Sequence, residues 1–248
     1  MEHCRTGEER LEISWTSPGI LLMRIRDRQG HVPSRAIISD IRFHQTSARE
    51  RPEAAPRWVV MQMEAPHAAS GDAHPFDEDA LLDSVDMLLD NIDGWGADVI
   101  TVAAIESHAR DAILETAASC DLVVCAASTR FGFTPNSRSM GAAFGGDVLL
   151  ARRIGEEGLR MARGETEAGA RDMLASGLVN RVSCDGDALG SALQLIDEID
   201  ATRSKHLQAR RSLAQCNPIR PDQLYLSSSQ WLGVLDGMRP QERAAYLA

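Results

Sequence analysis

The chain has 248 residues, of which 44% are hydrophobic and 25% charged, the balance of an ordinary globular protein that can bury a core without disulfides or metals. Its 26 basic and 36 acidic side chains give a formal net charge of −10, which argues against nucleic acid or an anionic membrane surface as the main partner. Lys205 is the only lysine, so Schiff-base chemistry and a Walker-type phosphate loop have almost no lysine to use.

The N-terminal residues are polar and acidic, unlike a signal peptide, and no apolar run approaches the ~18 residues of a membrane span. We therefore expect a cytoplasmic protein. The five cysteines are odd in number and form no CxxC pair, which favours reduced thiols. No two of the seven histidines have metal-ligand spacing, so we expect no metal.

The first quarter of the chain predicts a polar leader, a hairpin and a helix. Residues 1–10 form the leader, and the alternating residues 11–15 and the apolar residues 19–25 pair as strands. Residues 34–45 have helical periodicity, with Ile37, Ile38, Ile41 and Phe43 as candidate core residues. Residues 46–56 are charged, contain two prolines and predict a solvated loop.

The middle of the chain alternates strands with helices, which is typical of an α/β fold with a largely parallel sheet. Buried strands are predicted at 57–63, 98–105 and 121–127, and a loop of small residues at 65–75. The helices are expected at 76–92 and 109–119. The apolar face of the first comprises Leu81, Leu82, Val85, Leu88, Leu89 and Ile92.

The last third is mostly helical. Helices are predicted at 141–154, 156–163 and 167–176, the last ending at Gly177 as its C-cap. A short strand follows at 178–182. A long helix is expected at 187–214, and a C-terminal helix at 222–235 after two prolines.

An ordered series of segments between Asp98 and Val182 resembles the crotonase (enoyl-CoA hydratase/isomerase) superfamily. The series comprises the strand DVITVAAI, the segment SCDLVVCAASTRFGF, the glycine-rich GAAFGGDVLLARRIG and the final EAGARDMLASGLVNRV. The resemblance implies a spiral of ββα units over residues 1–185 and a helical, trimerising region over 186–248. It also implies a homotrimer or a dimer of trimers.

Two further regions resemble the diffusible-signal-factor synthases within that superfamily. They are residues 34–63 and the tail ARRSLAQCNPIRPDQLYLSSSQWL. This likeness implies dehydration of a 3-hydroxyacyl thioester on acyl carrier protein, together with thioester hydrolysis. A place in fatty acid or polyketide metabolism would follow.

The superfamily stabilises negative charge on the thioester oxygen with two backbone N–H groups. The resemblance places one in the loop containing Ser70, Gly71 and Asp72, and the other at Ala112, where a helix N-terminus suits an oxyanion. The family has a glycine triplet where this chain has Asp111, Ala112 and Ile113. Asp111 either caps the helix, which we favour, or takes part in proton transfer.

Glu115 lies where the family has its first acid/base glutamate, and it is our candidate catalytic residue. A solvated or ion-paired helix residue is the alternative. Pro135 stands at the expected position of the second glutamate and cannot transfer a proton. Asn136 in the same loop is a candidate substrate-binding residue. His108 before the helix either faces the site or lies at the surface.

One carboxylate is compatible with dehydration or elimination, thioester hydrolysis, isomerisation or decarboxylation. We therefore expect a lyase-like or hydrolytic enzyme that uses no separate cofactor, because coenzyme A or phosphopantetheine belongs to its acyl-CoA or acyl carrier protein substrate. The alternative is a degenerate homologue that serves as a binding or partner subunit. The arginines at 152, 153, 160, 210 and 211 form either a solvated basic face or a cradle for such a carrier.

Overall fold

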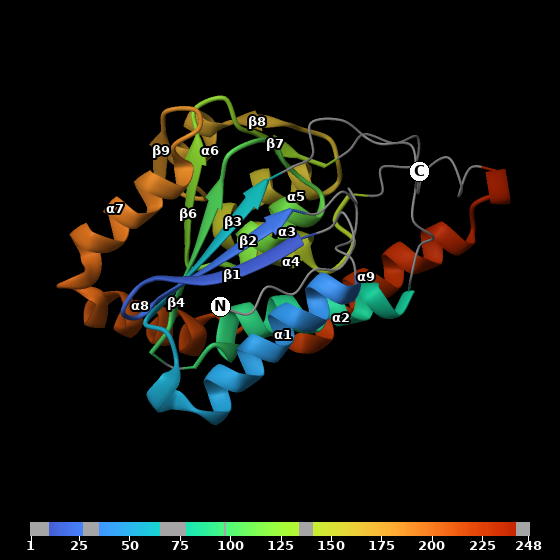
Figure 1. Cartoon of the computed structure of the whole chain (residues 1–248). Helices are drawn as coiled ribbons and strands as arrows, with labels where there is room; N and C mark the ends of the chain where they lie inside the picture. Colours follow the sequence, from blue (N-terminus) through green and yellow to red (C-terminus); the bar gives the residue numbers. More distant parts are fainter. Residues whose placement is uncertain (1–9, 27–34, 65–77, 97, 134–140, 242–248) are drawn as a thin grey trace.

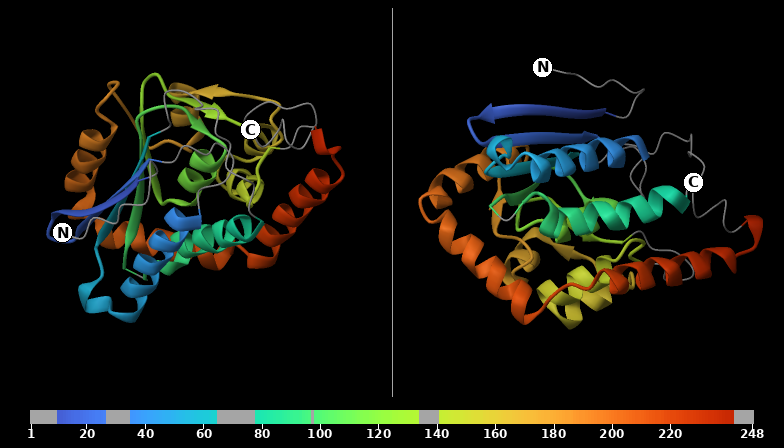
Figure 2. Two further views of the ribbon diagram at one scale, coloured as in Figure 1. Left: turned by 45° about the vertical axis from the view of Figure 1, so that its right-hand side comes forward. Right: turned by 90° about the horizontal axis from the view of Figure 1, so that it is seen from below.

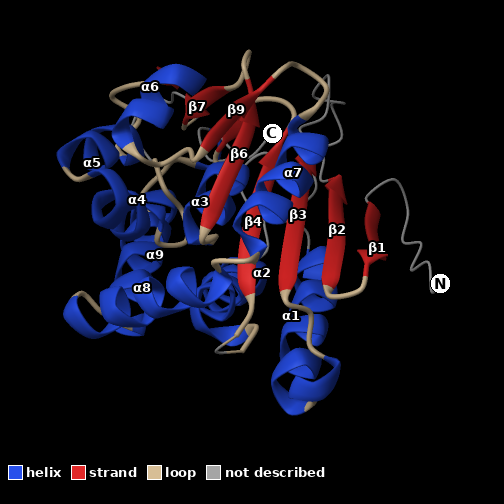
Figure 3. Cartoon of the chain, turned by 90° about the vertical axis from the view of Figure 1, so that its left-hand side faces the viewer, coloured by secondary structure: helices blue, strands red, loops and turns tan. Residues whose placement is uncertain are grey.

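The computed structural model describes residues 10–26, 35–64, 78–96, 98–133 and 141–241. At its centre lies a six-stranded sheet of order β1-β2-β3-β4-β6-β9, in which β1 is antiparallel to β2 and every other pair is parallel (Figures 1 and 3). The α/β fold expected from the sequence is confirmed. The strands are β1 (Arg10–Ser17), β2 (Ile20–Arg26), β3 (Trp58–Glu64), β4 (Ile100–Ile105), β6 (Leu122–Ala126) and β9 (Arg181–Ser183).

A second, small sheet of order β5-β7-β8 lies beside the main one. Its strands are β5 (Ala109–Arg110), β7 (Arg130–Gly132) and β8 (Ala168–Gly169). Strands of two or three residues carry too short a pattern to be predicted from periodicity. This small sheet matters for function because β5 leads directly into the helix that contains Glu115.

Helices cover both faces of the main sheet (Figures 2 and 3). Successive residues of each inner strand alternate between two apolar clusters: Val59 and Met61 face one, Trp58 and Val60 the other. A parallel sheet buried on both sides requires such apolar strands. The helices are α1 (Arg35–Glu50), α2 (Glu78–Leu89), α3 (Ala112–Ser119), α4 (Gly146–Ile154), α5 (Glu156–Ala162), α6 (Ala170–Ser176), α7 (Ala188–Asp200), α8 (Arg203–Cys216) and α9 (Pro221–Asp236).

Four expectations about the helices are wrong. Residues 46–50, expected in a solvated loop, are the last residues of α1. Phe43 is 67% exposed, because the buried stripe of α1 lies on the opposite side of the helix, at Ile37, Ile38 and Ile41. Leu82 is 41% exposed at the edge of the buried face of α2. The long helix predicted at 187–214 is two helices, because the Asp200 carboxylate that ends α7 accepts hydrogen bonds from the Trp58 indole (2.8 Å) and the Arg57 guanidinium (2.7 Å).

The C-terminal helices lie over different parts of the core. Helix α7 packs on β4, β6 and β9, and its Ala192 and Ile196 complete the second apolar cluster. Helix α9 runs along α2 and α4 (Figure 2). Its Leu224 and Trp231 join the first apolar cluster, so the C-terminal helix is part of the core of the chain.

Candidate functional site

The N-terminus of α3 is the place where the sequence predicts an oxyanion-binding group. The chain leaves the small sheet at Arg110, turns at Asp111 and enters the helix at Ala112. The first hydrogen bond of the helix runs from the N–H of Glu115 to the carbonyl of Asp111 at 3.0 Å. The N–H groups of the first turn therefore have no acceptor within the helix, and they lie at its positive end.

Asp111 holds a strained backbone at this turn. Its φ of 48° and ψ of −120° make it the one non-glycine residue with positive φ among the described residues. A side chain in this nearly glycine-only conformation costs about 1–3 kcal/mol, and such strain gathers at functional sites. The cap that we favoured is wrong, because the Asp111 side chain makes no hydrogen bond to the first turn of α3.

Glu115 lies one turn into α3, and its side chain is completely buried. Three backbone N–H groups of the glycine-rich turn before α4 donate to its carboxylate. Oε1 accepts from Ala143 at 2.7 Å, and Oε2 accepts from Phe144 at 3.0 Å and from Gly146 at 2.7 Å. Glu115 therefore joins α3 to the N-terminus of α4, where the helix dipole favours a carboxylate.

Two opposing effects act on the protonation of Glu115. Burial disfavours the charged form and dominates, while the three N–H donors favour it. The balance raises the pKa of Glu115 from 4.5 to about 8. A carboxyl with a pKa near neutrality is suited to proton transfer, whereas a fully buried one with three donors is suited to holding structure.

The glycine-rich turn owes its shape to two close backbone approaches. A Cβ on Gly141 would lie 1.3 Å from the Ala162 carbonyl oxygen, and one on Gly146 would lie 2.7 Å from Oε2 of Glu115. Gly145 has a φ of +105°, which ends the turn and starts α4 five residues later than the sequence predicts. The three donors to Glu115 therefore come from residues that we expected inside a helix.

Helix α9 covers this turn from the outside. A Cβ on Gly145 would lie 2.6 Å from Cγ of Leu224, and the Ser227 hydroxyl donates to Asp147 in the first turn of α4 at 2.6 Å. The C-terminal helix thus closes one side of the site within the same chain. In the sequence, the glycine pair ahead of a helix marks this turn. It does not show that the N–H groups of the turn bind Glu115, which lies about 30 residues earlier.

The other predicted site residues have separate outcomes. Ser70, Gly71, Asp72 and Asn136 lie outside the described residues. His108 is exposed. The predicted basic residues do not all lie in one cradle: Arg160 pairs with Glu157 and Glu165, Arg211 with Asp98 and Arg210 with Asp121, while Arg153 donates to backbone carbonyls at the end of α3.

Among the described residues, no group of three or more His, Cys, Asp and Glu side chains is arranged to hold a metal ion. In the same residues no helix combines the length and the apolar character needed to cross a membrane.

Comparison with known proteins identifies the family. The family model of enoyl-CoA hydratase/isomerase matches residues 76–225, which is more than half of the chain. The chain belongs to this family. A curated "putative enoyl-CoA hydratase" of Thermus thermophilus is 32% identical over 120 residues. The match spans 48% of this chain and 47% of that relative, about half of its length.

Several solved structures share the fold over nearly the whole chain. An enoyl-CoA hydratase from Mycobacterium avium subsp. paratuberculosis has a TM-score of 0.73 at 17% identity, covering 96% of this chain and 97% of that one. One from Bacillus anthracis has a TM-score of 0.70 at 17% identity and covers 93% and 92%. DspI of Pseudomonas aeruginosa has a TM-score of 0.67 at 17% identity and covers 92% and 89%.

Proposed function

We propose that this chain is an enzyme of acyl thioesters that binds the thioester carbonyl oxygen at the N-terminus of α3. Family membership supports an acyl-CoA substrate, as the name of the family says. The observation that carries the proposal is the strained Asp111 at the start of α3, a helix whose first N–H groups have no acceptor within the helix. The Ser70–Asp72 loop would supply the second N–H.

Glu115 is the proton-transfer group in this proposal. Each carboxylate oxygen has two lone pairs; Oε2 uses both, whereas Oε1 accepts one hydrogen bond, from Ala143. In this proposal Oε1 is the atom that exchanges a proton with the substrate. A pKa of about 8 leaves a minority of the carboxyl ionised at neutral pH, able to act as the base, and makes the protonated form a ready donor.

Two reactions fit one carboxyl group. In elimination, the ionised form of Glu115 takes the proton α to the carbonyl, the electrons of that C–H bond form the double bond, and the same carboxyl gives the proton to the 3-hydroxyl, which leaves as water. In hydrolysis, the ionised form of Glu115 takes a proton from the water that attacks the carbonyl carbon, and the same carboxyl gives this proton to the departing thiolate. Both place negative charge on the carbonyl oxygen, where the N–H groups of α3 stabilise it.

The likeness to the diffusible-signal-factor synthases leads us to propose an acyl carrier protein as the carrier of the acyl group and a trimer as the assembly. The basic residues are consistent with a carrier only in part, because Arg210, Arg211 and Arg160 already pair with acidic side chains. Coenzyme A and acyl carrier protein therefore both belong in the test.

A specific observation favours a second candidate, a degenerate homologue that binds a thioester or a partner without turning it over. Glu115 is wholly buried, and its three hydrogen bonds explain its presence without any chemistry. In that case Glu115 only positions the turn before α4.

The test is a panel of 3-hydroxyacyl, enoyl and malonyl thioesters, each on coenzyme A and on carrier protein, incubated with the wild type and followed by mass spectrometry. Loss or gain of 18 mass units with the thioester intact would identify dehydration or hydration, and release of free thiol would identify hydrolysis. Binding without any change of mass would contradict the enzyme and support the binding homologue.

A further inference from the structure

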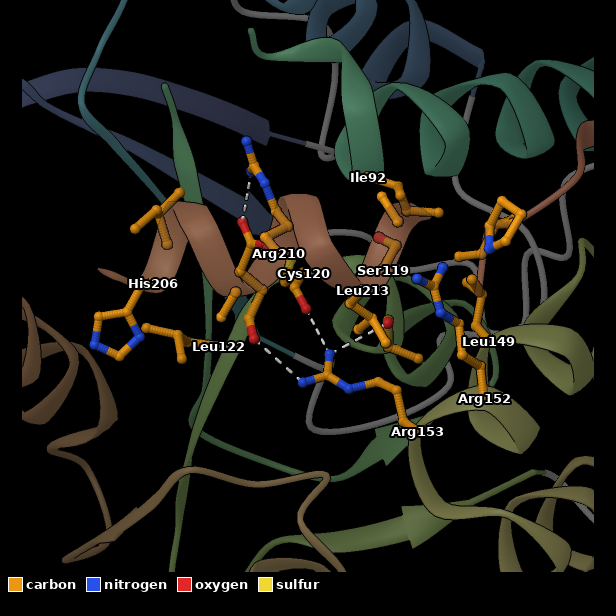
Figure 4. A pocket seen from close by; sticks show the side chains of 17 residues that line it. Ile92, Ser119, Cys120, Leu122, Leu149, Arg152, Arg153, His206, Arg210 and Leu213 are labelled. Atoms are coloured by element: carbon orange, nitrogen blue, oxygen red, sulfur yellow. Dashed lines mark hydrogen bonds and ion pairs between the residues drawn. The ribbon is translucent and has the colours of Figure 1, made fainter. Parts of the chain in front are cut away.

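A cavity of about 360 Å³ lies at the opposite end of α3 from Asp111. It is bounded by the end of α3, the first residues of β4 and β6, α4 and α8 (Figure 4). An eight-residue helix is about 12 Å long, so this cavity is separate from the proposed oxyanion site. Its volume falls in the range of small-molecule sites.

The walls combine apolar side chains with an excess of positive charge. Ile92, Ile100, Leu122, Leu149 and Ile219 contribute hydrocarbon. Three arginines, at 152, 153 and 210, line the cavity, and Asp121 is the one carboxylate among the lining residues described. The local formal charge is thus about +2, in a chain whose net charge is −10.

Arg153 carries most of the argument. Its guanidinium donates to the carbonyl oxygens of Ala118 (3.3 Å), Cys120 and Asp121 (3.3 Å), and it forms no ion pair with any described residue (Figure 4). Three of its five N–H groups are used. Burial lowers the pKa of Arg153, which reflects the cost of a half-buried charge that forms no ion pair with any described residue.

Arg210 differs from Arg153 because it is neutralised. It pairs with Asp121 at 3.2 Å and donates to the Val99 carbonyl at 2.6 Å, which anchors α8 to the sheet. Apart from this anchor, α8 is thinly packed: Leu207 is its one buried side chain, and Leu213 is 51% exposed at the cavity. Helix α8 therefore spans the cavity without filling it.

We propose that this cavity binds a small amphipathic carboxylate, with its anion on Arg153 and its hydrocarbon between α4 and α8. A guanidinium offers paired donors that match a carboxylate, and the anion would compensate the half-buried charge. The apolar lining distinguishes such a ligand from a bare inorganic anion. This inference does not depend on the reaction proposed above.

The experiment is calorimetric titration of the full chain with octanoate, octanol and inorganic phosphate. We expect saturable binding of one octanoate per chain, and at least tenfold weaker binding of octanol and phosphate. Arg153→Met should weaken octanoate at least tenfold. Arg160→Met, which removes an exposed arginine outside the cavity, should leave it unchanged.

A second variant keeps the test valid if Arg153→Met fails to fold. Ala209 lies exposed on α8 at the cavity, so Ala209→Trp should fill the cavity without disturbing the core and should abolish octanoate binding. Equal binding of octanol and octanoate, equal binding by Ala209→Trp and wild type, or no saturable binding would each overturn the proposal. Self-association that closes the cavity would also overturn the proposal. It would be seen as a change in the sedimentation mass caused by Ala209→Trp, together with no binding of octanoate.

Discussion

Glu115→Gln tests the state of the buried carboxyl group through the pH dependence of stability. In the folded chain burial raises the pKa of Glu115 to about 8 from 4.5. The folded state therefore prefers the protonated form, so the stabilisation is complete below pH 4.5 and is lost as the pH rises toward 8. Glutamine has no such proton, so its contribution is independent of pH.

The magnitude follows from the difference in pKa. Each unit by which a pKa differs between the folded and unfolded chain corresponds to about 1.4 kcal/mol. A rise from 4.5 to about 8 therefore makes the wild type lose about 5 kcal/mol, relative to Glu115→Gln, between these two pH values.

The assay is urea unfolding of both proteins at half-unit intervals from pH 4.5 to 8.5. We expect the difference in unfolding free energy to fall by about 1.4 kcal/mol per pH unit through most of this range. Glu157→Gln, at a carboxylate whose side chain is 43% exposed, is the control and should show no such slope. Parallel curves for wild type and Glu115→Gln would refute the raised pKa.

Two further predictions concern the backbone around the site. Asp111→Gly relieves the strain at φ 48° and should raise the unfolding free energy by about 1 kcal/mol, seen as a higher Tm of about 2–4 °C; a lower Tm would show that the aspartate side chain stabilises the turn more than its strain costs. Gly141→Ala should destabilise by about 3 kcal/mol or more, since its Cβ would lie 1.3 Å from the Ala162 oxygen. Gly233→Ala in α9, where a Cβ meets nothing within 4 Å, should stabilise by up to about 1 kcal/mol, and equal effects of the two substitutions in chemical denaturation would contradict the close packing of the turn.

The sheet was predictable because its strands carry their own signal. Strand β1 alternates polar and apolar residues, and β2, β3, β4 and β6 are short apolar runs; the structure places each within a few residues of its predicted range. The same argument explains the error at Phe43. Residue type suggested a core position, although two residues separate Phe43 from Ile41, and such a step points to the other side of a helix.

The break between α7 and α8 could not be predicted because tertiary contacts cause it. Asp200 pairs with Arg57 and Trp58, about 140 residues earlier in the chain, and no local residue marks the end of the helix. The fully buried position of Glu115 was equally hidden, since its partners at 143–146 are distant in sequence. For Asp111 the resemblance did indicate the backbone conformation. The family has a glycine triplet at this place, and glycine is expected where φ is positive.

The account depends most on whether Glu115 transfers a proton in turnover of a thioester. The direct measurement compares the single-turnover rate of wild type and Glu115→Gln on whichever thioester the panel identifies, together with the Kd of that thioester for both. We predict a rate at least about 100-fold lower in the variant with little change in Kd, as expected when a general acid or base is removed. A folded Glu115→Gln protein that turns the thioester over at the wild-type rate would contradict the account and leave Glu115 as a structural link between α3 and α4.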